Sequence, residues 1–66
     1  MQYELSQREK QVARLILKGK NPIEIGKELG ISATTVRNYS LNLRQKTGFP
    51  SSTREAARIA KERGML

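Results

Sequence analysis

The chain has 66 residues, of which 36% are hydrophobic and 29% are charged, and its net charge is +7 with a pI near 10.4. This length leaves room for one domain (residues 1–66) with a small core, because a chain this short buries only about 60% of its unfolded surface. It contains neither cysteine nor histidine, which excludes a disulfide framework and a thiolate metal site and argues against an enzyme or a bound cofactor.

Capping signals predict the first two helices. The segment SQRE (Ser6–Glu9) has the form of a capping box, in which each side chain binds the backbone amide of the other residue. We therefore predict a helix over Gln7–Lys18. The segment NPIE (Asn21–Glu24) places asparagine at the N-cap and proline at the first helical position, and it predicts a second helix over Pro22–Leu29.

The same signals predict two more helices. Ser32 is a suitable N-cap for a helix over Ala33–Thr47, and STRE (Ser52–Glu55) is a further capping box that begins a helix over Thr53–Arg63. A glycine follows each predicted helix, as is typical where a helix ends in the left-handed conformation. Because no stretch alternates like a strand, we predict an all-α fold, a compact four-helix domain.

Apolar residues recur at helical spacing in each segment, which indicates that the helices share one core. The simplest role for these residues is packing. The predicted core residues are Val12, Ala13, Leu15, Ile16 and Leu17 in the first helix, Ile25 and Leu29 in the second, Val36, Tyr39 and Leu43 in the third, and Ala56, Ile59 and Ala60 in the fourth.

The segment ELGIS between the second and third helices predicts a tight corner. Gly30 ends the second helix, Ile31 can turn into the core, and Ser32 begins the third helix. Gly26 lies four residues before Gly30, where a missing side chain lets the third helix approach closely. This spacing favours a helix-turn-helix, in which two helices meet at a steep angle.

The positive charge gathers around the third predicted helix, because no acidic residue lies between Glu28 and Glu55. A solvated basic surface and attraction to a polyanion both fit this pattern. No apolar run approaches the ~18 residues of a membrane span, so we expect a cytoplasmic protein that does not contact membranes.

Several motifs occur along the chain in the order and near-constant spacing that are typical of one protein family. They are LSQRE, EIGKELGIS, TVRNY and EAARIAKERGML. In these the chain resembles the LuxR/GerE-type DNA-binding domain of bacterial transcription regulators. The resemblance covers essentially the whole chain and suits a stand-alone regulator and an excised domain equally. It departs from the family pattern at Tyr39, Gly26 and Thr47, where histidine, alanine and leucine are usual. Region four of sigma factors shares the corner, but the fourth helix fits LuxR/GerE better.

The resemblance implies sequence-specific binding to double-stranded DNA, with the third helix as the recognition helix in the major groove. Arg37 can bind guanine and Asn38 can bind adenine, each with two hydrogen bonds. Leu41 either contacts a thymine methyl group or is simply an exposed leucine. The predicted base contacts are Thr34, Arg37, Asn38 and Leu41. The predicted phosphate contacts are Thr35, Tyr39, Arg44, Lys46, Lys20, Asn21 and Lys27, of which Lys20 and Lys27 fit solvated lysines almost as well.

One recognition helix reads only a few base pairs, so we expect a homodimer on DNA, which the resemblance also implies. The fourth helix is not needed for the corner, and small Ala57 on its outer face would admit a twin helix. The predicted interface is Arg54, Ala57, Arg58 and Lys61. RNA polymerase is a further partner that we expect for such a regulator. The alternative from another class is a basic helical module that binds an acidic protein.

Overall fold

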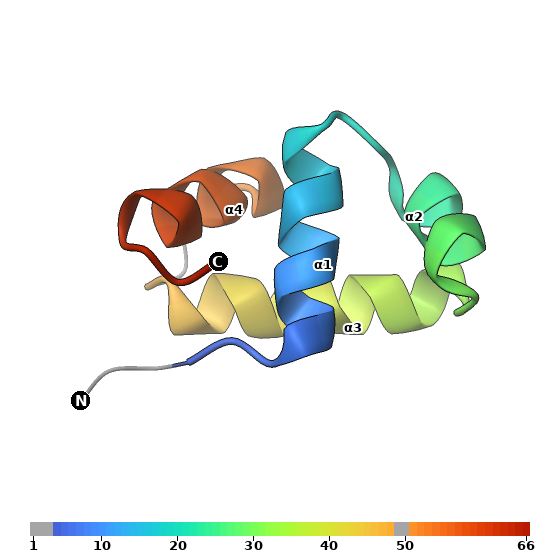
Figure 1. Cartoon of the computed structure of the whole chain (residues 1–66), viewed down its shortest axis with the longest axis horizontal. Coiled ribbons are helices and arrows are strands. Elements are labelled where there is room, and N and C mark those ends of the chain that lie inside the picture. The colour runs from blue at the N-terminus through green and yellow to red at the C-terminus, as the bar shows by residue number, and fades with distance from the viewer. Residues whose placement is uncertain (1–3, 49–50) are drawn as a thin grey trace.

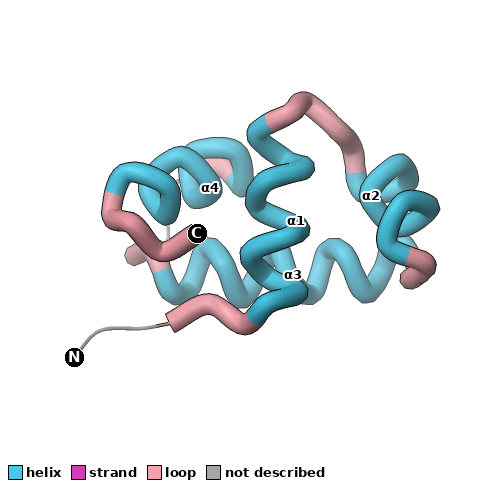
Figure 2. The backbone as a smooth tube through the Cα atoms, in the orientation of Figure 1, coloured by secondary structure: helices cyan, strands magenta, loops and turns pink. Residues whose placement is uncertain are grey.

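The computed structural model describes residues 4–48 and 51–66, and residues 1–3 and 49–50 lie outside the described part. The predicted all-α fold is confirmed, and the described residues include no strand (Figure 2). The helices are α1 (Gln7–Leu17), α2 (Pro22–Leu29), α3 (Ala33–Lys46) and α4 (Thr53–Glu62).

The predicted helix boundaries are close to the observed ones. The second helix agrees at both ends, whereas the other three end one residue earlier than predicted. The last residue predicted for each is its C-cap: Lys18 for α1, Thr47 for α3 and Arg63 for α4. Each cap still donates its backbone amide to the last turn of its helix, so the sequence signal runs one residue past the end of the helix.

The helix starts follow the predicted capping signals with one exception. Reciprocal hydrogen bonds of a capping box form at the starts of α1 and α2. At α4 only half of the predicted box forms, because the Ser52 hydroxyl accepts from the Glu55 amide at 3.1 Å but the Glu55 carboxylate pairs with Arg58 instead. A cation on the same helix face thus replaces the backbone amide as the partner of this carboxylate.

The long helix α3 packs against each of the other three helices. Figure 1 shows α1 crossing α3, with α2 over the N-terminal half of α3 and α4 over its C-terminal half. Two groups of buried side chains fill these crossings, and half-buried Ile16 packs against both. The first group is Leu5, Ala13, Leu43, Ala56, Ala57 and Ala60, and the second is Val12, Leu15, Ile25 and Val36.

The inward face of α4 differs from the predicted one. Ala57, predicted on the outer face, is 0% exposed, whereas Ile59, predicted in the core, is half-buried and belongs to neither group. Ala56, Ala57 and Ala60 together form a smooth face that lets α4 pack closely on α1 and α3. The helix is therefore turned so that its small residues, and not its largest apolar one, fill the crossing.

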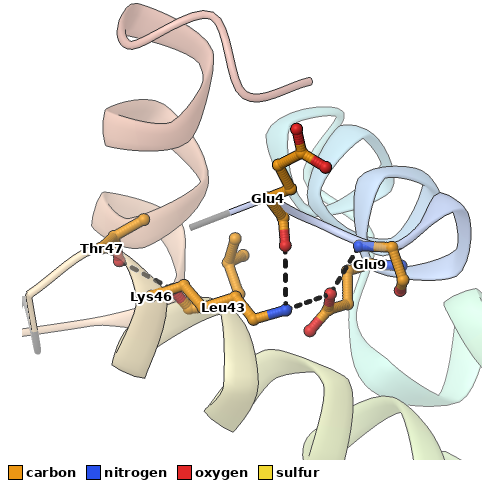
Figure 3. A network of polar contacts seen from close by, with 6 residues as sticks. Glu4, Glu9, Leu43, Lys46 and Thr47 are labelled. Carbon is orange, nitrogen blue, oxygen red and sulfur yellow. Dashed lines mark hydrogen bonds and ion pairs between the residues drawn. The ribbon is translucent and has the colours of Figure 1, made fainter. Parts of the chain in front are cut away.

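A partly buried ion pair joins the end of α3 to the beginning of α1 (Figure 3). Glu9 is only 3% exposed, and its Oε1 accepts from the Ser6 backbone amide at 2.7 Å and from Lys46 Nζ at 2.8 Å. Lys46 Nζ also donates to the Glu4 carbonyl at 3.1 Å. The ammonium group of Lys46, predicted to contact phosphate, thus neutralises a carboxylate of its own chain, and a phosphate contact by Lys46 stays a prediction.

This ion pair makes the stability of the fold depend on pH. Burial raises the pKa of Glu9, but the hydrogen bonds from Lys46 and Ser6 lower it more, and the net pKa lies below the ordinary 4.5. Since the folded pKa is the lower one, the contribution is complete above the unfolded pKa and is lost as the pH falls through the folded pKa.

We expect Lys46→Met, which keeps the apolar stem, to lower the free energy of unfolding at neutral pH by about 1–3 kcal/mol, because it leaves Glu9 without its cation. The same change should raise the pKa of Glu9. Urea unfolding at a series of pH values and NMR titration of the Glu9 carboxyl measure both effects. Glu28→Gln at an exposed carboxylate is the matched control. An unchanged Glu9 pKa in the Lys46 variant would contradict this account.

Candidate nucleic-acid interface

A rigid corner fixes α3 relative to α2. Gly30 ends α2 in the left-handed region at φ 72°, and the Ile31 amide returns to the Gly26 carbonyl at 2.9 Å. Ser32 then caps α3 by accepting from the Thr35 amide at 3.1 Å. Gly26 is buried, and a Cβ there would lie 2.5 Å from the Ile31 carbonyl oxygen. The predicted close approach at Gly26 is thus confirmed, and the backbone of the corner occupies the missing side chain's place.

The side of α3 opposite the core carries the four predicted base contacts. Thr34, Arg37, Asn38 and Leu41 are all exposed, while Val36 is fully buried beneath the corner. Their spacing of three, four and seven residues places them on one face of the helix. We call these four residues the exposed stripe of α3. The structure brings them together and leaves them accessible, and Leu41, 49% exposed, is the large apolar member.

The predicted phosphate contacts fall into two groups. Lys27 is exposed on α2, and half-buried Lys20 and Arg44 lie in a groove beside the exposed stripe. These three cations come from the α1–α2 connection, from α2 and from α3, and such side chains can contact a polyanion.

The other predicted phosphate contacts already serve the fold. The Asn21 side chain caps α2 by accepting from the Glu24 amide at 2.9 Å, and the Thr35 hydroxyl shares a 2.9 Å hydrogen bond with Ser32. Tyr39 packs against the second core group. Asn21 and Thr35 retain further hydrogen-bonding capacity toward solvent, and the partly exposed Lys46 gives two of its three N–H donors to Glu9 and Glu4.

Sequence reasoning missed the groove beside the stripe. It has a volume of about 300 Å³ and lies where α1, α2, α3 and the first residue of α4 meet. The only sequence signal for it is Ser40, a small polar residue one turn after core residue Val36, where a large apolar residue would fill the space. The groove is lined by Ile16, Lys20, Pro22, Ile25, Arg37, Ser40, Leu41, Arg44 and Thr53.

The outer face of α4 is basic. Arg54, Arg58 and Lys61 are exposed and share one side of the helix, with Arg58 paired to Glu55. Ala57 does not belong to this surface, because it is fully buried against α1 and α3. The predicted role of Ala57 in admitting a twin helix is therefore wrong, and only the three basic residues remain as a candidate interface.

The described residues also limit the kinds of partner that the domain can bind. Within the described residues, no three His, Cys, Asp or Glu side chains gather to hold a metal ion, and no helix is long and apolar enough to cross a membrane. The large hydrophobic residues exposed in that part of the chain are Ile23 and Leu41. Their scarcity favours a charged partner over a protein partner on the α3 surface.

Comparison with known proteins identifies relatives of this arrangement. The profile of the GerE family, described as bacterial regulatory proteins of the luxR family, matches residues 3–60. The chain is 42% identical over 60 residues to the transcriptional regulatory protein DesR of Bacillus subtilis (strain 168), covering 91% of this chain and 30% of the relative. It is 42% identical over 62 residues to the uncharacterized transcriptional regulatory protein YvfU of the same organism, covering 94% and 30%. The chain thus spans less than a third of either relative's length.

Proposed function

This chain belongs to the luxR family of bacterial regulatory proteins and is a DNA-binding helix-turn-helix domain, and we propose that it regulates transcription by placing α3 in the major groove. The observation that carries the docking proposal is the exposed stripe of α3, held by a rigid corner on a domain of net charge +7. The proposal places this regulator in the cytoplasm, with RNA polymerase as a further partner. The proposal requires no catalytic residue and no cofactor.

Each residue of the stripe has a distinct chemical role in the proposed complex. Arg37 offers two parallel donors that match the O6 and N7 acceptors of guanine. Asn38 offers one donor and one acceptor, which match N7 and the amino group of adenine. Leu41 supplies the apolar contact for a thymine methyl group, and Thr34, near the start of α3, can bond a base edge or the adjoining phosphate. Together they select a short run of base pairs.

Three further cations set the affinity for DNA and not the preference for a base sequence. Lys20, Lys27 and Arg44 bind phosphates in the proposed complex, and each neutralised phosphate releases about 0.9 counterion. Affinity should therefore fall steeply with salt on every duplex.

We expect Arg37→Ala and Arg44→Ala to have different effects on DNA binding. Arg37→Ala should cost roughly 1–3 kcal/mol on the preferred site, less on random duplex, and relax preference at one base pair. Arg44→Ala should weaken all duplexes similarly and reduce the salt slope by about 1. Fluorescence anisotropy at several salt concentrations measures both, on a site first selected from random duplex DNA.

Two outcomes would contradict these roles. Salt-independent affinity of the unmodified chain would exclude phosphate binding. Equal losses on selected and random duplexes would make Arg37 a phosphate contact and not a base contact. Circular dichroism of each variant shows whether the fold is retained.

The proposal includes a homodimer on DNA through Arg54, Arg58 and Lys61 of α4. Two recognition helices about 10 base pairs apart on one face of the duplex would double the sequence read. The three cations repel each other across a two-fold axis, so DNA must bring the two copies together.

We expect Lys61→Cys to form an intermolecular disulfide on DNA with two half-sites and not on DNA with one. The chain has no cysteine of its own, so the introduced cysteine is the one thiol that can form the disulfide. Non-reducing gel electrophoresis after mild oxidation measures the product. Lys18→Cys, exposed beyond the end of α1, is the control. Equal cross-linking on both DNAs, or equal yields from both variants, would rule out an α4 interface.

A further inference from the structure

We propose that the groove beside the exposed stripe of α3 is a binding site for a small amphiphilic anion, a molecule with a carboxylate or phosphate group on an apolar body. The groove joins two chemistries that such a ligand needs. Its apolar lining comes from Ile16, Pro22, Ile25 and Leu41, and its cationic lining from Lys20, Arg37 and Arg44.

The small size of Ser40, on the inner side of α3, explains why the groove is open. Val36 and Leu43 are fully buried on this side, and Ser40 lies between them. The Ser40 hydroxyl donates to the Val36 carbonyl at 3.0 Å, so its hydrogen-bonding need is met within the helix. A satisfied serine takes much less room than the leucine or isoleucine that a core position would hold, and the space beside it stays open.

Charge complementarity identifies the ligand as an anion. No acidic residue lines the groove among the described residues. Its three cations are Lys20 in the α1–α2 connection and Arg37 and Arg44, which are seven residues apart on α3. An anionic group at this edge would meet opposite charges within a partly apolar wall, where ion pairing is stronger than in open water.

Size and lining favour a small molecule over a polymer. A volume of about 300 Å³ is at the lower end of the range of ligand pockets, which are mostly apolar with a few polar groups that fix orientation. A pair of fused rings bearing one anionic group matches this size. A DNA strand, by contrast, would present a chain of phosphates that needs a continuous polar surface and little apolar floor.

Occupancy of this site would oppose DNA binding, a consequence that rests on the proposed function. Arg37 and Leu41 line the groove and also belong to the exposed stripe. A ligand that holds the Arg37 guanidinium removes it from guanine, so anion and DNA compete. The binding of the anion itself does not depend on the proposed function.

The direct test is an NMR titration of the 15N-labelled chain, without DNA, using 1-naphthoate and 1-naphthyl phosphate as probes. We expect saturable shifts confined to the groove residues, with a dissociation constant on the order of a millimolar or tighter, the range for ligands of this size. The two probes separate a carboxylate preference from a phosphate preference. Neutral 1-naphthylmethanol should bind at least about tenfold more weakly; equal binding of the neutral probe would overturn the proposal.

Variants of Ser40 test the space itself. Ser40→Leu should fill the groove and weaken the probes by about tenfold or more, whereas Ser40→Ala keeps the space and should bind as the unmodified chain does. Gln45→Leu adds the same side chain at an exposed position of α3 outside the groove and should change nothing. Unchanged probe binding by Ser40→Leu would overturn the proposal.

A pair of charge reversals keeps the test decisive even where Ser40→Leu folds poorly. Lys20→Glu places an anion in the groove lining and should weaken the probes several-fold, while Lys10→Glu makes the same change on the first turns of α1 and should not. Equal effects of the two reversals would show attraction to the whole basic surface, and the assigned site would be wrong.

A competition experiment with DNA separates the proposed DNA binding from the proposed anion site. With the unmodified chain, 1-naphthoate should displace duplex DNA, and Ser40→Leu should retain DNA affinity within about twofold yet resist displacement. If a Ser40→Leu variant that is folded by circular dichroism loses DNA and probe together, the groove seats a DNA strand and the small-anion proposal fails. If no duplex binds while the probes still saturate the groove, the proposed function fails and the anion site stands.

Discussion

Gly26→Val is expected to remove a large part of the free energy of unfolding of the domain. A Cβ at this position would lie 2.5 Å from the Ile31 carbonyl oxygen and 3.4 Å from the Ala33 amide nitrogen. Both are backbone atoms of the corner, so a rotamer change cannot relieve the overlap, and valine adds two further carbons. Overpacking of this kind typically costs about 1–3 kcal/mol and more where backbone must move.

That loss is large for a chain this small. At roughly 0.05–0.15 kcal/mol per residue, 66 residues give about 3–10 kcal/mol of total stability. Urea unfolding followed by circular dichroism measures the change. Lys27→Val is the matched control, because it places the same β-branched residue at the next, exposed position of α2 and should cost only about 0.5 kcal/mol in helix propensity. Similar losses in both variants would contradict the close approach.

Ala57→Glu should likewise abolish the fold. Ala57 is 0% exposed and packs in the group that contains Leu5 and Leu43. A carboxylate there has neither space nor a partner among these apolar neighbours, and burying an unpaired charge costs several kcal/mol. Arg58→Glu, one residue along on the exposed side of α4, puts the same side chain into water and is the control.

Thermal unfolding separates the two α4 variants. We expect Ala57→Glu to show no cooperative transition and Arg58→Glu to melt close to the unmodified chain. A folded Ala57→Glu would mean that α4 turns Ala57 outward, and the dimer surface would then have to be redrawn to include it.

Gly26→Val and Ala57→Glu would also lose DNA binding, but only through loss of structure. Neither can therefore report on DNA readout or on dimer formation. Those roles are tested at exposed positions, Arg37 for readout and Lys61 for the dimer, where a substitution leaves the core intact.

The sequence alone determined the local features of this protein. Helix starts and ends depend on residues within a few positions of each other, such as Ser6 with Glu9, and on glycines that accept the left-handed conformation. The corner at Gly26 and Gly30 is equally local. The exposed stripe of α3 followed from helical periodicity, because residues opposite Val36 and Leu43 must face solvent. That these side chains contact bases remains a proposal.

Only the tertiary structure decided which distant residues meet. Lys46 pairs with Glu9 across 37 positions of sequence, and no local pattern distinguishes that lysine from a solvated one. Ala57 is fully buried and Ile59 only half-buried, against the prediction, because the rotation of α4 is set by how closely it can approach α1 and α3. The groove beside Ser40 arises from four elements together. In each case packing, a property of surfaces brought together by folding, overrode what hydrophobicity and charge indicate residue by residue.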